Sequence, residues 1–267
     1  MKGLADIYAT LFRTEAAVQL QYRAALIIWL IGLVVQPVVY LVVWLTVAKA
    51  QGGQVGGFSS GDLAAYYIAL MVINHLTFTW IMFEFEYRVR SGSFSPLLLQ
   101  PLHPIHTDIT INIAYKVLTS AVTLPVALIL VFLFQPDFHP QPWALAALVP
   151  ALALAFALRF LVEWCLALSA FWTTRVGALN QVYFAALLFL SGRMAPLELM
   201  PAWVQTLATL MPFRWMLAFP VELVMGRLSI EQVLHGLAAQ GAWVGASLGL
   251  LALVWRRGLK EYGAVGA

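Results

Sequence analysis

Long apolar runs alternate with short polar or proline-rich segments along this chain. A helix that crosses a bilayer needs about 20 mainly apolar residues, and six runs reach that length. The pattern therefore predicts an all-α integral membrane protein, a single transmembrane domain of residues 1–267 with six transmembrane helices. The expected spans are residues 24–48, 63–85, 109–134, 143–172, 176–195 and 233–255.

The segment before the first span has a different pattern. In residues 3–22, apolar side chains recur at helical spacing on one face and polar side chains occupy the rest. This spacing predicts an amphipathic helix that lies at the membrane interface. Residues 52–61, rich in glycine, are expected to form a flexible turn after the first span, with Asp62 suited to cap the next helix.

Composition supports a membrane protein. The chain is 62% hydrophobic and 10% charged, whereas about a quarter of the residues of a soluble domain are charged. The net charge of +3 gives no support to nucleic-acid binding, because basic residues are expected on the cytoplasmic side of a membrane protein. A single cysteine, Cys165, leaves no disulfide framework and no cysteine-based metal motif.

The largest polar break between apolar runs is residues 86–108. Ser95 followed by Pro96 is a helix-start signal, with a hydroxyl to cap free N–H groups and a proline whose missing N–H costs nothing there. Pro101 and Pro104 limit this helix to little more than one turn. The turn carries three consecutive leucines, Leu97, Leu98 and Leu99. These leucines indicate either a plug for a groove on another protein or a loop tucked against the ends of the chain's own helices.

Two charged residues lie inside the fourth span. Arg159 and Glu163 are four residues apart, so they share one helix face and each can neutralise the other. A structural ion pair and a contact with substrate are both open readings of this intramembrane pair. Lys116 lies close enough to the start of the third span that we expect it to extend outward to the membrane surface.

Prolines and glycines shape the last third of the chain. Residues 196–226 are divided into pieces too short to cross a bilayer, which predicts a re-entrant or interfacial helical hairpin. The dividing prolines are Pro196, Pro201, Pro212 and Pro220. In the sixth span, Gly241, Gly245 and Gly249 place small residues at every fourth position, which lets two helices approach closely. Their partner is another span of this chain or another subunit.

The distribution of Lys and Arg predicts the orientation. If both termini are cytoplasmic, ten basic residues lie inside and four outside, which agrees with the positive-inside rule. The inside set is Lys2, Arg13, Arg23, Arg88, Arg90, Lys116, Arg175, Arg256, Arg257 and Lys260. The 86–108 loop then faces the cytoplasm, and the 196–226 hairpin faces outward.

Catalytic and nucleotide-binding motifs can be tested directly. The phosphate-binding motif G-x-x-x-x-G-K-[ST] requires a Gly-Lys step, and the sequence has none. Residues 57–61 match G-x-S-x-G, but they lack the strand that would position a nucleophilic serine. Two sets of side chains are candidate metal ligands: His103, His106 and Asp108, and His75 with Glu84. Neither forms a known metal-binding pattern, so we expect no catalytic, cofactor or metal residues.

Over nearly its whole length the chain resembles the permease subunits of the ABC type-2 exporters. Residues 90–101, Arg-Ser-Gly-Ser-Phe-Ser-Pro-Leu-Leu-Leu-Gln-Pro, look like the coupling helix of that family, and residues 190–196 and 210–213 look like its outer hairpin. The resemblance assigns ATPase coupling to Arg90, Gly92, Phe94, Ser95, Pro96, Leu97, Leu98, Leu99 and Pro101. It assigns the outer hairpin to Gly192, Pro196, Pro201, Pro212, Phe213 and Glu222.

The resemblance also implies partners and a mechanism. It implies two copies of a separate ABC ATPase that binds ATP and Mg, a second permease subunit, like or unlike, and residence in a bacterial inner membrane. It implies export of a hydrophobic or amphipathic substrate, such as a drug-like molecule, a lipid or a glycolipid. Two other hypotheses stay open: an intramembrane enzyme that uses His and Glu residues of the second span and its loop, and a structural membrane subunit.

Overall fold

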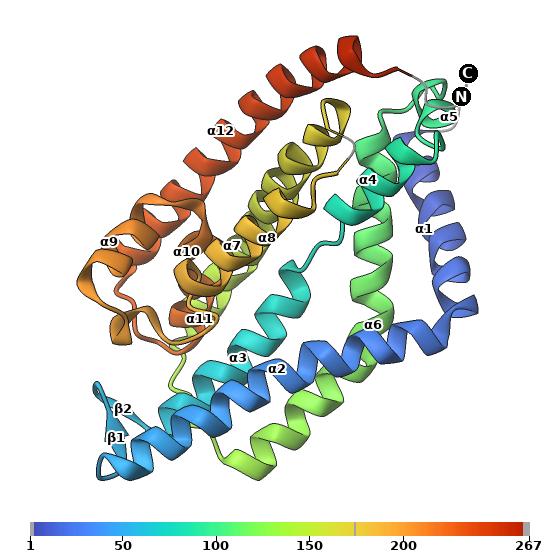
Figure 1. Cartoon of the computed structure of the whole chain (residues 1–267). Helices are drawn as coiled ribbons and strands as arrows, with labels where there is room; N and C mark the ends of the chain where they lie inside the picture. The colour runs from blue at the N-terminus through green and yellow to red at the C-terminus, as the bar shows by residue number, and fades with distance from the viewer. Residues whose placement is uncertain (1–2, 174, 264–267) are drawn as a thin grey trace.

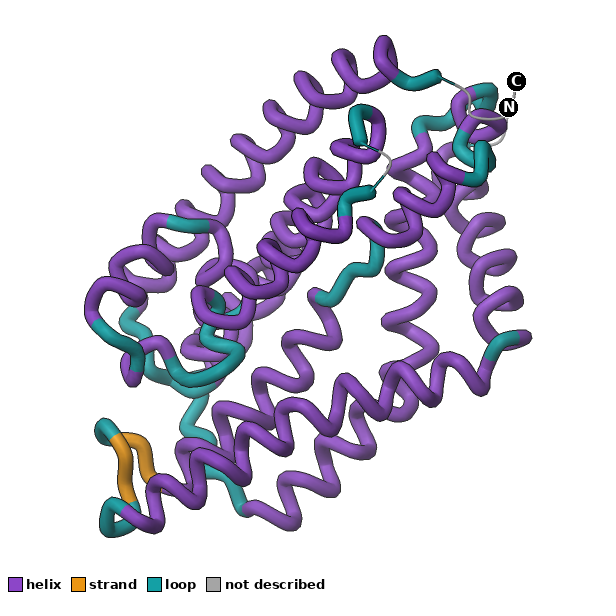
Figure 2. Tube along the Cα trace, in the orientation of Figure 1, coloured by secondary structure: helices purple, strands orange, loops and turns teal. Residues whose placement is uncertain are grey.

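The computed structural model describes residues 3–173 and 175–263, apart from the side chains of residues 23, 25 and 26. Lys2, and the side chain of Arg23, lie outside this part, so their predicted positions are not described. The described chain is helical except for one short hairpin (Figures 1 and 2). The first half contains α1 (Leu4–Gln21), α2 (Arg23–Ala50), β1 (Gln54–Val55), β2 (Phe58–Ser59), α3 (Ser60–Thr77), α4 (Met82–Arg90), α5 (Ser95–Leu98) and α6 (Pro104–Phe134).

The second half contains two long helices with short helices between them. These elements are α7 (Pro142–Ala167) with a 3₁₀ turn at Leu168–Phe171, α8 (Gly177–Leu190), a 3₁₀ turn at Leu197–Leu199, α9 (Ala202–Leu210), α10 (Pro212–Met216), α11 (Ala218–Val224) and α12 (Ile230–Glu261). The start of α1, the turn α5 and the end of α12 gather at one end of the molecule. The β hairpin and α9 lie toward the opposite end.

Five helical stretches of the described chain are long and apolar enough to cross a membrane. They are Ile27–Ala50, Ser60–Arg90, Pro104–Phe134, Pro142–Phe171 and Ile230–Glu261. The predicted fifth span, residues 176–195, is a helix of only 14 residues, α8, about 21 Å long and shorter than the hydrocarbon core. It ends at Leu190 because the chain turns at Gly192, whose φ is 80°, a conformation that favours glycine.

The second predicted span is interrupted. Helix α3 ends at Thr77 and α4 begins at Met82, so residues 78–81 interrupt the helix, with Phe78 and Ile81 as its caps on either side. The carbonyl oxygen of Phe78 instead accepts a hydrogen bond from Lys116 Nζ at 2.6 Å. Our expectation that Lys116 extends outward is therefore wrong. The lysine is buried, because the broken helix supplies a carbonyl partner inside the bundle.

Two helix starts also differ from the prediction. The third long helix begins at Pro104 rather than at residue 109, since the ring of His103 accepts a hydrogen bond from Ile105 N at 3.2 Å and serves as its cap. Ser59, not Asp62, caps α3. The Ser59 hydroxyl accepts from Asp62 N, and the Asp62 carboxylate accepts from Ser59 N, at 3.0 Å each, which is a capping box.

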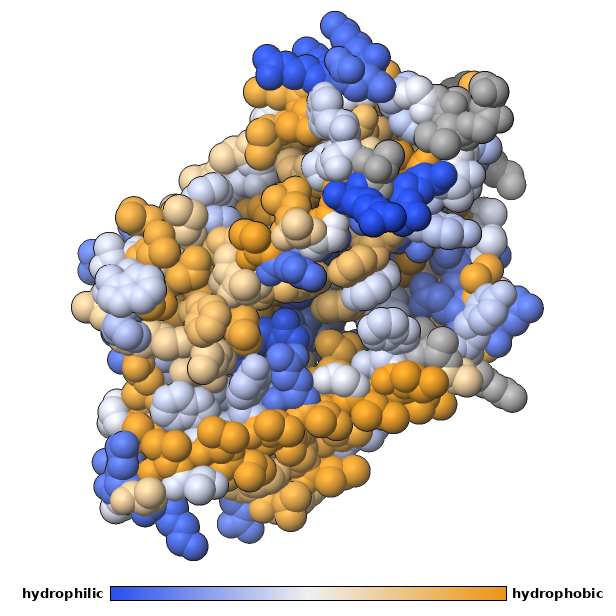
Figure 3. Space-filling model, viewed as in Figure 1, coloured by the Kyte–Doolittle hydropathy of each residue, from blue (hydrophilic) through white to orange (hydrophobic). Residues whose placement is uncertain are grey.

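The core centres on α3 and α7. Thirteen of the 18 residues of α3 are buried, because α2, α6, α7 and α11 surround it. Large apolar side chains are exposed along α2, α6 and α12, and those of α2 form an orange band in Figure 3. Continuous exposed apolar surface of this kind suits contact with lipid rather than water.

Candidate functional site

The predicted one-turn helix in the polar loop is present as α5. Its N-cap residue is Phe94 rather than Ser95. The Ser95 hydroxyl instead shares a hydrogen bond of 2.9 Å with the hydroxyl of Tyr262, beyond the end of α12. The side chain that we expected to cap the turn therefore joins it to the last part of the described chain.

A cluster of aromatic side chains fixes α5 to the bundle. Phe94 is fully buried, and its ring lies 4.8 Å from Phe85, 5.6 Å from Phe171 and 5.6 Å from Tyr262 between centroids. Trp255 of α12 also contacts Phe94, at 6.3 Å. These rings come from α4, the 3₁₀ turn after α7, and α12. One turn of helix cannot stabilise itself, so this aromatic cluster holds α5 in place.

The three leucines of the loop have different environments. Leu97 and Leu98 are partly buried and pack against the chain's own core, whereas Leu99 is 88% exposed. Two of the leucines therefore tuck against the protein, and the third projects from it. Arg90 is exposed and pairs with Glu86 at 3.5 Å. Gly92 has a φ of 73° and turns the chain between α4 and α5.

Other residues of the loop have their own places. Pro96 lies in the first turn of α5, and Pro101 follows it on the exposed surface. The three side chains weighed as metal ligands do not converge. The ring of His103 packs 4.3 Å from Trp255, His106 Nδ1 shares a hydrogen bond of 2.6 Å with Tyr8, and Asp108 pairs with Arg88 at 2.6 Å.

The charged pair of the fourth span lies at the centre of a buried polar cluster. Arg159 Nε is 3.3 Å from Glu163 Oε1, and the two side chains are 0% and 1% exposed. Arg159 also donates to Asn74 Oδ1 at 2.9 Å, and Glu163 accepts from the Tyr183 hydroxyl at 3.0 Å. The pair thereby connects α7 with α3 and α8. Neither charge reaches the surface of the described structure.

The predicted hairpin residues form a compact cap on α3. The hydroxyl of Tyr66 donates to the carbonyl of Gly192 at 2.6 Å, and that of Tyr67 donates to Met194 at 2.8 Å. Glu222 pairs with Arg214 at 2.8 Å, although burial raises the pKa of its carboxyl to about 7. The prolines begin or precede the short elements of this cap. Pro196 precedes the 3₁₀ turn Leu197–Leu199, Pro201 precedes α9, and Pro212 begins α10 with Phe213 after it.

The glycines of α12 lie on two different faces. A Cβ atom added at Gly241, Gly245 or Gly249 would meet no described atom within 4 Å, whereas one at Gly236 would meet Phe219 at 2.1 Å. The Gly241–Gly249 stripe therefore makes no close contact with another described helix of this chain. Of the two partners that we considered for the stripe, a span of the same chain is excluded for the described residues.

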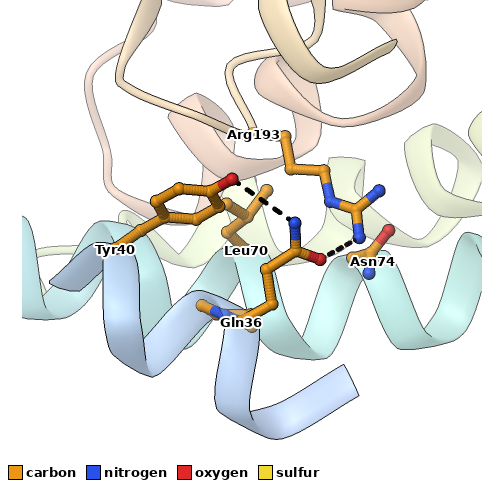
Figure 4. A pocket seen from close by; sticks show the side chains of 6 residues that line it. Gln36, Tyr40, Leu70, Asn74 and Arg193 are labelled. Carbon is orange, nitrogen blue, oxygen red and sulfur yellow. Dashed lines mark hydrogen bonds between the residues drawn. The ribbon is translucent and has the colours of Figure 1, made fainter. Parts of the chain in front are cut away.

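A cavity of about 580 Å³ opens between α1, α2, α4 and α6. Beside it, Gln36 lies between Tyr40 and Arg193 (Figure 4). Arg193 donates a hydrogen bond to Gln36, which in turn donates to the Tyr40 hydroxyl at 3.4 Å. Sequence reasoning did not find this cavity, because its lining comes from segments far apart in the chain. The only local signal was a polar residue, Gln36, within an apolar run.

The chain was compared with models of known protein families. Residues 23–266 match the model of the ABC-2 family transporter protein. The chain belongs to this ABC-2 family. No curated protein and no solved structure matches the chain.

Family membership gives the geometry its context. An ABC-2 protein of this kind is a multi-pass membrane permease of an ABC transporter, and the family implies association with an ABC ATPase. Helix α1 precedes the matched residues, whereas the aromatic cluster, the buried ion pair and α5 lie within them. The described contacts do not join the His75 and Glu84 side chains named in the enzyme hypothesis. His75 lies near Ser120 and Thr119, whereas Glu84 pairs with Arg88.

Proposed function

We propose that this ABC-2 permease exports a hydrophobic or amphipathic molecule, driven by ATP that two copies of a separate ATPase bind with Mg and hydrolyse. The observation that supports the coupling is the exposed Leu99 at the end of an α5 turn that the aromatic cluster holds rigidly. A rigidly held turn with a projecting apolar side chain suits insertion into a groove on another protein.

The proposal includes an orientation. Both termini lie on the cytoplasmic side of a bacterial inner membrane, together with α5 and the exposed Arg90, Arg256, Arg257 and Lys260. The outer hairpin of residues 196–226 then faces away from the cytoplasm. A second permease subunit, like or unlike, completes the transporter. The exposed Gly241–Gly249 stripe is available for it, because no described part of this chain covers the stripe.

The test is to change Leu99 to Asp and to purify the permease with its ATPase. A carboxylate buried at the contact would cost several kcal/mol, so we expect ATPase copurification and substrate-stimulated hydrolysis to fall together. The melting temperature of the permease alone should not change, because the Leu99 side chain has almost no contact within the chain.

The matched control is Leu210→Asp, which changes an exposed leucine of α9 at the opposite end of the molecule. It should leave ATPase binding intact. If the Leu99→Asp protein retains its ATPase and transports as the unchanged protein does, α5 is only a connection and the coupling proposal is wrong.

A further inference from the structure

The cavity between α1, α2, α4 and α6 has the size of a small-molecule site. Its volume of about 580 Å³ lies within the range of about 300 to 1,000 Å³ typical of ligand pockets. Gly32 of α2 is part of its wall, and a Cβ atom added there would meet nothing within 4 Å. The volume suits a compact organic molecule rather than a complete two-chain lipid.

Four aromatic rings form a continuous row along the wall of this cavity. Trp29 of α2 lies 5.0 Å from Trp80, Trp80 lies 6.3 Å from Phe78, and Phe78 lies 6.3 Å from Tyr115 of α6. Trp80 and Phe78 belong to the interruption between α3 and α4, so the break in the helix brings two of the four rings into the wall. Aromatic faces carry negative charge density and attract organic cations. The Arg159 guanidinium already lies 5.4 Å from the centre of the Phe78 ring, so the other three rings are those offered to a cationic guest.

Carboxylates outnumber basic groups at one end of the row. Glu15, Glu84 and Asp108 line the cavity there with a single guanidinium, that of Arg88. Arg88 contacts Asp108 at 2.6 Å and Glu84 at 3.3 Å. Burial raises the pKa of Glu15, which favours its neutral form. Even with Glu15 neutral, two carboxylates face one guanidinium here, and the Glu84 side chain remains 47% exposed. The described side chains at this end therefore carry a net negative charge, which favours a cationic guest.

Arg193 occupies another part of the lining, beside Gln36 and next to Asn74. Its positive charge disfavours a cation at that position. A cationic guest would therefore place its charge toward Glu84 and Glu15 and its apolar groups against the rings. The lining thus favours a guest that is apolar and positively charged, and it favours binding with the charge toward Glu84 and Glu15.

We propose that this cavity binds a hydrophobic organic cation of compact size. Resting on the proposed export function, such a cation is also the transported substrate. The aromatic row supplies the apolar and cation-attracting wall, and the carboxylate end supplies the charge selection.

The test uses two ions of the same shape and opposite charge, tetraphenylphosphonium and tetraphenylborate. Binding of each to the full chain in phosphatidylcholine nanodiscs is measured by equilibrium dialysis, with empty nanodiscs as the blank. We expect saturable binding of tetraphenylphosphonium and at least about tenfold weaker binding of tetraphenylborate, since opposite charge reverses the sign of each electrostatic contribution. Equal binding of the two ions, or no saturable binding of the cation, would overturn the proposal.

Variants assign the binding to this cavity. The double variant Glu15→Gln, Glu84→Gln should weaken tetraphenylphosphonium binding about fivefold, as expected for partly exposed ion pairs. Glu231→Gln, which changes an exposed carboxylate at the start of α12, should not weaken it.

Trp80→Ala should weaken tetraphenylphosphonium binding by a similar factor, whereas Trp203→Ala, at an exposed tryptophan of α9, should not. Melting temperatures are measured in parallel. Unchanged binding in the folded double carboxylate variant would place the cation elsewhere.

The substrate claim has a separate readout. With the ATPase bound, tetraphenylphosphonium should raise the hydrolysis rate, and the double carboxylate variant should shift the half-maximal concentration upward by the same factor as the dialysis constant. Saturable binding without stimulation would overturn the substrate claim alone. Saturable binding by a permease that captures no ATPase would contradict the proposed function and leave the binding site standing.

Discussion

The Arg159 side chain has no exposed surface, so its charge depends on partners inside the protein. Glu163 and Asn74 supply oxygen atoms for it from α7 and α3. Removal of one member of a buried ion pair leaves an uncompensated charge in a medium that does not solvate it. The stability lost when either residue is removed therefore comes mainly from the unpaired charge left on the other.

We expect non-additive effects of the changes Arg159→Ala and Glu163→Ala. Each single change should cost about 3–5 kcal/mol, and the double variant should be more stable than either single variant. Thermal unfolding of the four proteins in the mutant cycle measures the coupling. The pair Arg159→Ala and Glu222→Ala gives the control, because these residues do not contact each other in the described hydrogen bonds and ion pairs. Losses that simply add for Arg159 and Glu163 would show that the two groups do not pair.

The sequence allowed this pair to be predicted, but not the rest of the cluster. Four-residue spacing places Arg159 and Glu163 on one helix face whatever the fold. Asn74 is 85 residues from Arg159, and Tyr183 is 20 residues from Glu163, so only the packing of α3, α7 and α8 brings them together. The difference between Leu97 or Leu98 and Leu99 has the same origin. Identical neighbours in the sequence become buried or exposed according to where the aromatic cluster holds α5.

At the scale of elements, the break between α3 and α4 shapes the cavity between α1, α2, α4 and α6. It turns one predicted span into two helices and places Phe78 and Trp80 in the wall of the cavity. Nothing in the local sequence reveals it, because Phe78-Thr-Trp-Ile81 is as apolar as the helical residues around it and contains no proline or glycine. The stabilising group, Lys116, lies 38 residues away. Apolar run length predicts where a helix can cross a membrane, and it does not predict where that helix breaks.

We expect Lys116→Met to loosen this interruption. The change removes the donor to the Phe78 carbonyl, and an unpaired buried carbonyl costs about 1–3 kcal/mol. The melting temperature should fall, and hydrogen exchange should accelerate in residues 78–85. Lys49→Met, which changes an exposed lysine near the end of α2, provides the control. Unchanged exchange in residues 78–85 would mean that the lysine does not stabilise the break.

At the scale of the whole molecule, α12 has one buried face and one uncovered face. Val233, Gly236, Gln240, Ser247, Leu251 and Gly258 are buried on one face. Gln240 donates to the carbonyl groups of Ala151 and Trp215 at 3.0 and 2.8 Å, which ties the helix to α7 and the outer hairpin. The Gly241–Gly249 stripe lies on the uncovered face. The sequence shows that the small residues are present, and both the buried glycines and the stripe would suit a close helix contact. Only the fold shows which of them contact another part of the described chain.

We therefore expect opposite behaviour from two glycine changes. Gly236→Leu should destabilise the isolated chain by about 1–3 kcal/mol or more through overpacking against Phe219. Gly245→Leu should leave its melting temperature unchanged and reduce association between permease subunits, because the new side chain separates two close backbones. Size-exclusion chromatography with light scattering measures the oligomeric state. An intact oligomer in the Gly245→Leu protein would show that the stripe faces lipid.

The hydrogen bond between the Ser95 and Tyr262 hydroxyl groups links α5 to the end of α12. Under the proposed coupling, a movement of α5 would therefore be transmitted along α12. A helix of 32 residues is about 48 Å long, so a tilt of about 5° imposed at the α5 end displaces the opposite end by about 4 Å if the helix stays straight. The half of α12 nearer that end carries the contacts of Gln240 with α7 and α10 and of Gly236 with α11. Under the proposed coupling, a push on Leu99 would reach the hairpin at the other surface through α12 together with α7, which packs against it.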